Sequence, residues 1–350
     1  MFLRPRPNLV LGLILLIAAV WAPEGRAQEV DPLPSWNDGP VKTSIIEFVA
    51  RVTDEAGPGF VRPEERIATF DNDGTLWVEQ PIYTQLVFME DEAKRLSAAH
   101  PEWQDNSDIK ALMDGNFQHV LGLGPAGFAD LLATTHAGET AEEFDARVND
   151  WIDSAIHPRF NQLYLDLVYL PQIELMDYLR DNDFKVFIVS AGSIAFMRAW
   201  ADETYGVAPP NVVGTNIETS FSFSQDYGEI VRESKAGFVT DAAGKAEGID
   251  LHIGQRPIFA FGNSGGDKEM LEYTRSGSGD RMALIVYHDD AEREYAYGPA
   301  GGLPNTGIGV FTQALMDQAK SDGWHVVSMK EDWKRIFAFE EAESTAGDAE

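Results

Sequence analysis

The chain has 350 residues, of which 44% are hydrophobic and 11% aromatic, so it is long and apolar enough for one large globular domain or two smaller ones. Its 57 acidic and 27 basic residues give a formal net charge of −30, which argues against nucleic acid as a partner, because phosphate backbones would be repelled. The absence of cysteine excludes disulfide bonds, thiolate metal ligands and a cysteine nucleophile.

The first 27 residues have the pattern of a Sec-type signal peptide. Arg4 and Arg6 precede an apolar run from Leu9 to Ala22, and small residues stand before the expected cleavage site. The run is shorter than the roughly 20 apolar residues that a membrane-spanning helix needs. Cleavage after Ala27 would release a periplasmic or secreted protein with no stable membrane insertion, and an uncleaved anchor is the alternative.

The remaining chain alternates apolar runs with helix-like stretches. Apolar residues at helical spacing predict a helix over 41–55. Four apolar runs predict buried strands, at 67–70, 184–191, 257–263 and 282–288. Runs that are apolar on both faces and alternate with helices predict an α/β fold, in which helices cover both faces of a parallel sheet. Ligands bind beyond the carboxyl ends of such strands. The residues at those ends are Asp71, Ser190, Asn263 and His288.

A long segment with helical periodicity separates the first two predicted strands. Because residues 80–165 would stand at the ligand-binding edge, we expect them to form a helical cap that acts as a lid. The expected organisation is a signal peptide at 1–27, a core domain made of 28–79 and 166–340, the cap at 80–165 and an acidic flexible tail at 341–350.

The stretch Asp71-Asn72-Asp73-Gly74-Thr75, after the first strand, has three interpretations. An EF-hand calcium loop fails, because glycine stands fourth instead of sixth. A hairpin turn is favoured by Asp-Gly but opposed by flanks that do not alternate polar and apolar residues. The third interpretation is a catalytic pair, with Asp71 as nucleophile and Asp73 as general acid/base.

The groups that a phosphoryl-accepting aspartate needs follow in chain order. Ser190 offers a neutral hydroxyl donor, and Gly192 lets the backbone approach an anion. Lys245 is a point charge for phosphate, with Lys235 as its competitor. Asp267, in a glycine-rich loop after a predicted strand, suits Mg²⁺.

Four motifs in this order and spacing resemble the haloacid dehalogenase (HAD) superfamily of phosphohydrolases, and in particular its phosphoserine-phosphatase branch. They are DNDGT at 71–75, the serine of VSAGS, the lysine of GKAEGI and GNSGGD at 262–267. The resemblance implies a Rossmann-like core with a helical cap. It also implies a Mg²⁺-dependent phosphomonoesterase that hydrolyses small-molecule phosphate esters through an aspartyl-phosphate. Phosphoryl transfer to another alcohol and ligand binding on a degenerate, non-catalytic scaffold are the alternatives. The oligomeric state is not predicted.

The resemblance also implies roles for individual residues. The catalytic residues would be Asp71 and Asp73. The phosphate would be bound by Thr75, Ser190, Ala191, Gly192 and Lys245. The metal ligands would be Asp71, Asp73, Asn263 and Asp267. The acid at Asp73 favours ester hydrolysis over dehalogenation, because a halide leaves without a proton.

Position 263 departs from the family pattern, which usually has an aspartate directly after the glycine of the last motif. An amide oxygen still ligates Mg²⁺, but loss of the formal charge at Asn263 is expected to weaken binding. Asp267 would then ligate the metal directly.

Several other residues keep two interpretations. Glu79 would read a substrate amine or be a solvated glutamate at the hinge of the cap. His288 would contact substrate or orient Lys245, unless the aspartates that follow it merely cap a helix at 291–297. Aromatic residues of the cap would cage a cationic group or form a helical core: Tyr83, Phe88, Trp103 and Trp151. The histidines form no zinc-binding motif.

Overall fold

The computed structural model describes residues 31–224 and 226–340. The predicted signal peptide and the predicted acidic tail lie outside these ranges, so both remain predictions. Within the described ranges, no helix has the length and apolar character needed to span a bilayer.

The core contains a six-stranded, wholly parallel sheet in the order β3-β2-β1-β6-β7-β8. Its strands are β1 (Ile67–Phe70), β2 (Lys185–Ser193), β3 (Val212–Thr215), β6 (Phe259–Gly262), β7 (Met282–Tyr287) and β8 (His325–Ser328). The four predicted strands are confirmed as β1, β2, β6 and β7. The edge strands β3 and β8 were not predicted, because four residues with only two apolar side chains in a row give too little pattern.

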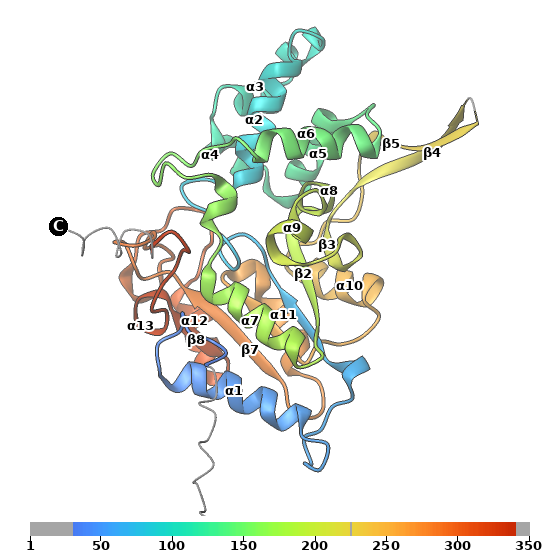
Figure 1. Cartoon of the computed structure of the whole chain (residues 1–350). Helices are drawn as coiled ribbons and strands as arrows, with labels where there is room; N and C mark the ends of the chain where they lie inside the picture. Colours follow the sequence, from blue (N-terminus) through green and yellow to red (C-terminus); the bar gives the residue numbers. More distant parts are fainter. Residues whose placement is uncertain (1–30, 225, 341–350) are drawn as a thin grey trace, which may run out of the picture. The chain divides into compact units, whose positions relative to one another are not determined.

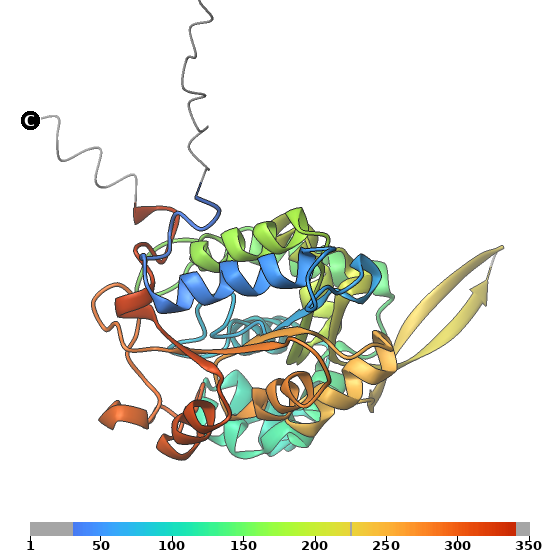
Figure 2. The ribbon, with the colours of Figure 1, turned by 90° about the horizontal axis from the view of Figure 1, so that it is seen from below.

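Helices cover both faces of this sheet, as the sequence predicted (Figure 1, Figure 2). One face carries α1 (Pro40–Thr53) and α7 (Leu170–Asp181). The other carries α10 (Ala243–His252), α11 (Lys268–Arg275) and α12 (Gln313–Ser321). The buried residues of helix α1 recur at helical spacing, so one face of the helix packs on the sheet. A proline occupies its first position, where no backbone N–H is needed.

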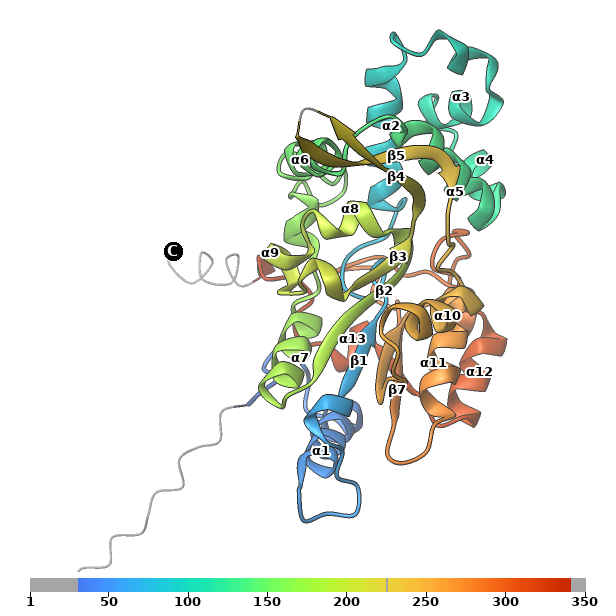
Figure 3. The ribbon, with the colours of Figure 1, turned by 90° about the vertical axis from the view of Figure 1, so that its right-hand side faces the viewer.

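A group of helices stands beyond the carboxyl ends of the strands (Figure 1, Figure 3). It comprises α2 (Thr84–Leu96), α3 (Ser107–Met113), α4 (Phe117–Gly122), α5 (Gly124–His136) and α6 (Ala141–Ile152). Phe88 lies at its centre, with ring centroids 6.0 Å from Phe144 and 5.3 Å from Phe196. Phe88 and Trp103 are therefore core residues rather than a cage for a cation.

The other helices of the described residues are short. They are α8 (Ile194–Arg198), α9 (Ala201–Tyr205), α13 (Met329–Asp332) and 3₁₀ turns at Pro63–Glu65, Pro101–Asp105, Tyr164–Leu167, Pro209–Asn211, Gly265–Asp267 and Ala300–Gly302. The helix predicted at 291–297 is wrong. That segment forms a turn, in which Asp290 Oδ1 accepts from the backbone N–H groups of Glu292 and Arg293.

An antiparallel hairpin, β4 (Ile217–Ser224) and β5 (Tyr227–Ala236), projects away from the sheet and was not predicted (Figure 1). Alternation of serine with phenylalanine in 220–224 is the strand signal that identifies it. Backbone hydrogen bonds of 2.9 Å join Arg232 to Gly138 and Glu139, so the hairpin is anchored to the turn between α5 and α6.

Candidate active site

Strand register brings the motif residues to one edge of the sheet. Phe70 of β1 is paired with Ile188 of β2 on one side and with Phe261 of β6 on the other. Asp71 follows this level by one residue, and Ser190 and Asn263 follow it by two. Because the strands are parallel, all three side chains emerge at the carboxyl edge, as the sequence predicted.

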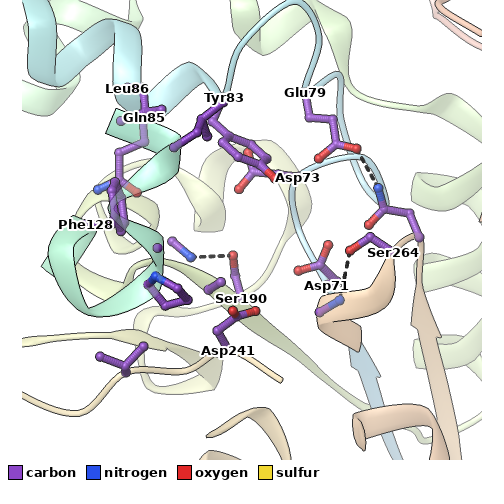
Figure 4. A pocket seen from close by; sticks show the side chains of 18 of the residues that line it. Asp71, Asp73, Glu79, Tyr83, Gln85, Leu86, Phe128, Ser190, Asp241 and Ser264 are labelled. Atoms are coloured by element: carbon purple, nitrogen blue, oxygen red, sulfur yellow. Dashed lines mark hydrogen bonds between the residues drawn. The ribbon is translucent and has the colours of Figure 1, made fainter. Parts of the chain in front are cut away.

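The loop after β1 is not a hairpin turn, since both neighbours of β1 are parallel strands. It closes on itself instead, through hydrogen bonds from Leu76 N–H to the Asn72 carbonyl (2.8 Å) and from Gly74 N–H to the Trp77 carbonyl (2.9 Å). Gly74 has φ 75°, a conformation that a side chain would strain. The loop thereby holds Asp71 and Asp73 toward one space (Figure 4).

That space is a pocket of about 270 Å³ between the sheet edge and the helices above it (Figure 4). The core contributes Asp71, Asp73, Glu79, Ser190, Ala191, Gly192, Asp241, Lys245, Asn263, Ser264 and Gly266. The helical segment contributes Tyr83, Gln85, Leu86, Val120, Leu121, Pro125 and Phe128. Three predicted site residues do not line the pocket. Thr75 and Asp267 form hydrogen bonds to residues that line it, and His288 contacts the loop of Asp73 from outside the pocket.

Lys245 bridges two carboxylates at the floor of the pocket. Its Nζ lies 2.5 Å from Asp71 Oδ1 and 2.5 Å from Asp267 Oδ1, and its side chain is only 2% exposed. Burial by itself would lower the pKa of Lys245, but the charges of Asp267 and Asp71 raise it overall, so the lysine stays a cation. The competing Lys235 lies on the exposed hairpin, where it pairs with Glu218, and is excluded as the lysine of the site.

The Asp73 carboxyl group lines the pocket and is hydrogen-bonded by Trp77. Trp77 Nε1 donates to its Oδ1 at 2.8 Å. Burial raises the pKa of Asp73 to about 6, with the hydrogen bond from Trp77 opposing that shift. A carboxyl group with a pKa close to neutral both gives and takes a proton at physiological pH, which is the requirement for a general acid/base.

Ser190 stands opposite the two aspartates (Figure 4). Its Oγ accepts the Gly192 backbone N–H at 3.1 Å, so the hydroxyl hydrogen is free to point into the pocket. Gln85 Oε1 accepts the Ser193 backbone N–H at 2.8 Å, which ties helix α2 to the end of β2. Among the described residues, Gln85 Nε2 has no hydrogen-bond partner.

Oxygen atoms suited to Mg²⁺ meet beside Asp71. The Thr75 hydroxyl lies 3.2 Å from Asp71 Oδ2 and 3.5 Å from Asn263 Oδ1, so these two oxygens face the same small region. Asp267 Oδ2 accepts the backbone N–H groups of Asn263 and Ser264, which makes it a support of the loop. Hard oxygen donors in an acidic pocket fit a divalent cation such as Mg²⁺.

Glu79 is 2% exposed, so its interpretation as a solvated hinge residue is wrong. Its Oε1 accepts from Asn263 Nδ2 at 2.7 Å and from the Tyr297 hydroxyl at 2.8 Å. Burial raises the pKa of Glu79 well above its usual range. His288 Nε2 lies 2.8 Å from the Gly74 carbonyl, and its Nδ1 3.3 Å from Glu294, so this histidine braces the loop instead of orienting Lys245.

The sequence did not predict Gln85, Asp241 or the partners of Glu79 as residues of the site. Gln85 is the second residue of helix α2 and has no motif around it, and Asp241 precedes α10 as an ordinary loop residue. Tyr297 contacts Glu79 across 218 residues, a separation at which no local pattern carries a signal.

A model of the family described as haloacid dehalogenase-like hydrolase matches residues 68–272. No curated protein matches the chain significantly. A solved structure of a protein with unknown function from Bordetella pertussis Tohama I is similar at 16% identity, with a TM-score of 0.48, over 75% of this chain and 98% of that one.

Two further solved structures are similar over much of the chain. One is a phosphoserine phosphohydrolase-like protein from Francisella tularensis, with 17% identity and a TM-score of 0.36 over 63% of this chain and 87% of that one. The other is a probable phosphoserine phosphatase from Vibrio cholerae, with 15% identity and a TM-score of 0.35 over 73% of this chain and 66% of that one.

Proposed function

Because this chain belongs to the haloacid dehalogenase-like hydrolases, we propose that it is an exported, Mg²⁺-dependent phosphomonoesterase acting on small phosphate esters. The observation that carries this proposal is the pair of aspartates after β1. Asp71 is held by Lys245 at 2.5 Å, and Asp73, with a pKa of about 6, faces the same pocket. A nucleophile beside an acid/base is the pair that transfer of a phosphoryl group through an enzyme ester requires.

In the first step, an oxygen of Asp71 attacks the phosphorus in line with the ester oxygen. The P–O bond to the substrate alcohol breaks, and Asp73 gives its proton to the departing oxygen. Ser190 donates its hydroxyl hydrogen to a phosphoryl oxygen, and Lys245 supplies positive charge beside the attacking carboxylate. The products are the free alcohol and an aspartyl-phosphate at Asp71.

In the second step, Asp73, now ionised, takes a proton from a water molecule, whose oxygen attacks the phosphorus. The bond between phosphorus and the Asp71 oxygen breaks, and inorganic phosphate leaves. Asp71, the carbonyl of Asp73 and Asn263 would hold Mg²⁺, which neutralises phosphate charge when bound. Phosphoryl transfer to a second alcohol would use the same residues.

The pocket lining limits the substrate. Lys245 is the sole cation among the described residues that line it, against the four acidic residues Asp71, Asp73, Glu79 and Asp241. A second anionic group on the substrate, such as a carboxylate, would find no partner there and be repelled. Apolar side chains from α2, α4 and α5 face the space where the alcohol would lie, and Gln85 Nε2 offers a neutral donor. The proposed substrate is therefore the monophosphate of a small, neutral, partly apolar alcohol.

The helices α2 to α6 are proposed to act as the cap. They line one side of the pocket, and Gln85 joins them to β2, so their closure would exclude bulk water while the phosphoryl group is transferred. Export rests on the sequence pattern of the first 27 residues alone.

A panel of phosphate monoesters that differ only in the alcohol tests this function. Release of inorganic phosphate from esters of neutral alcohols, at least roughly tenfold faster in kcat/KM than from phosphoserine, is the expected result; a tenfold ratio corresponds to about 1.4 kcal/mol. No release from any ester with Mg²⁺ present would contradict it. Added alcohols that capture the phosphoryl group in preference to water would favour phosphotransfer.

A further inference from the structure

We propose that Glu79 is a positioning residue that turns the amide of Asn263 so that its oxygen faces the metal position. This inference rests on the proposed function, since it concerns the same site. An asparagine amide has one oxygen and one NH₂ group at nearly equal distance from its Cβ, and only the oxygen ligates Mg²⁺. Unlike an aspartate, an asparagine at position 263 must therefore be oriented.

The hydrogen bonds around Glu79 provide that orientation. Glu79 Oε1 accepts from Asn263 Nδ2 at 2.7 Å, which leaves Asn263 Oδ1 toward Thr75 and Asp71. The Tyr297 hydroxyl donates to the same oxygen at 2.8 Å and fixes it from the other side. Oε1 accepts these bonds whether the carboxyl group is ionised or carries its proton on Oε2. The rotated amide would turn its oxygen toward Glu79 Oε1, so that two acceptors would face each other and the hydrogen bond to Glu79 would be lost.

The surrounding backbone is shaped for this contact. Gly74 and Gly309 both have positive φ, 75° and 58°. A Cβ on Gly74 would overlap Asn263 Nδ2 and Glu79 Oε1, and a Cβ on Gly309 would overlap the same Glu79 oxygen. Two glycines from distant parts of the chain thus leave room for one buried hydrogen bond. Tyr297 and Gly309 lie beyond the residues 68–272 that the family model matches, so this support is built by the rest of the chain.

The experiment measures binding of Mg²⁺ alone by calorimetry, and of Mn²⁺ by electron paramagnetic resonance, without substrate. Glu79→Met removes the acceptor at similar side-chain length and is expected to weaken metal binding by roughly 10- to 100-fold, the usual effect of losing a partner that orients a ligand. Glu79→Gln keeps one carbonyl oxygen as acceptor and is the matched control, expected to stay within about threefold of the unmodified protein.

A double variant separates orientation from a merely structural role. Asn263→Asp has two equivalent oxygens and needs no orientation, so adding Glu79→Met to it should cause no further loss of metal affinity. It should even improve affinity, because two carboxylates no longer face each other. The melting temperature without metal, recorded for every variant, reports any loss of fold independently.

Three results would overturn the inference: unchanged metal affinity in Glu79→Met, an equal loss in Glu79→Gln, or an equal loss when Asn263 is already aspartate. Absence of metal binding by the unmodified protein at about 10 mM Mg²⁺ would overturn it as well. If the unmodified protein binds Mg²⁺ and the variants behave as expected, but no phosphate ester is hydrolysed, the proposed function fails and the inference stands.

Discussion

At the scale of single residues, the proposed mechanism gives different roles to the two aspartates of the loop after β1. Asp71 is paired with a lysine and Asp73 with a tryptophan N–H, so their surroundings differ although they stand two residues apart. In the proposed mechanism, the carboxylate beside the lysine attacks while the other one moves a proton.

The role of Asp73 predicts a dependence on the leaving group. In Asp73→Asn, no acid protonates the departing oxygen and no base activates water, so kcat for alkyl phosphates should fall by roughly 10²- to 10⁴-fold. For p-nitrophenyl phosphate, whose leaving group needs no proton, the first step should survive and show a rapid burst of nitrophenol equal to the enzyme concentration. Stopped-flow absorbance measures the burst. An equal loss for both classes of ester would contradict the assignment.

Lys245 predicts an effect on stability. Replacing it with methionine leaves Asp71 and Asp267 as buried carboxylates without a cation, so the free energy of unfolding should fall by about 3–5 kcal/mol. Urea denaturation in EDTA measures this. The exposed ion pair of Lys235 with Glu218 is the control, and Lys235→Met should change stability by less than about 1 kcal/mol. Comparable losses in both variants would show that the buried ion pairs of Lys245 contribute no more to stability than the exposed pair of Lys235.

At the scale of elements, the helices above the sheet contain a buried histidine that has no role in the proposed mechanism. His136 at the end of α5 packs between Phe88 and Phe144, at centroid distances of 5.9 and 4.7 Å. Burial lowers the pKa of His136 to about 3, with a smaller contribution from the positive charge of Arg232. The ring is therefore neutral in the folded protein at pH values where the unfolded chain would bind a proton.

This shift predicts how stability depends on pH. Because the pKa is lowered on folding, the contribution of His136 to stability is complete above the unfolded pKa of about 6.5 and is lost as the pH falls toward 3. Between pH 7 and pH 5, the loss from this residue should be about 2 kcal/mol. In His136→Leu, the drop in unfolding free energy over that interval should be smaller by this amount. Identical pH profiles for the two proteins would refute the prediction.

The sequence predicts four of the strands and the residues at their ends, but not the contacts between distant elements. Strands β1, β2, β6 and β7 follow from apolar runs, and with them the placement of Asp71, Ser190 and Asn263, because parallel strands end at one edge. The contacts that finish the site do not follow. Tyr297 and Gly309 reach Glu79 through the tertiary fold, and the loop that carries them has no periodic pattern. The hairpin β4–β5 was not predicted, although serine and phenylalanine alternate visibly along it. Its phenylalanines give it the composition of a buried strand, but Phe221 and Phe223 are 69% and 65% exposed.

At the scale of the whole molecule, the proposal predicts that a divalent cation stabilises the fold. Binding to the folded state alone adds about 2.7 kcal/mol when Mg²⁺ is at a hundred times its dissociation constant. The melting temperature should therefore rise with Mg²⁺ and return to its starting value with EDTA, and the rise should be much smaller in Asp71→Asn. A rise of the same size in that variant would place the cation elsewhere on this acidic protein, whose net charge is −30.

The predicted export and signal-peptide cleavage are tested on the full-length protein expressed in cells. Amino-terminal sequencing of the protein recovered outside the cytoplasm should begin at Gln28. Recovery only from membranes, with the first residues intact, would instead favour an uncleaved anchor.

The central claim is that Asp71 carries the phosphoryl group, and mass spectrometry of the quenched enzyme tests it most directly. The protein is mixed with a phosphate ester that it hydrolyses, stopped within milliseconds and treated with borohydride, which reduces an aspartyl-phosphate and leaves free carboxylates unchanged. The account predicts reduction at Asp71 in the unmodified protein, a larger yield in Asp73→Asn, where the second step is slowed, and neither reduction nor turnover in Asp71→Asn. Sustained turnover in Asp71→Asn, or a phosphoryl group on any other residue, would contradict it.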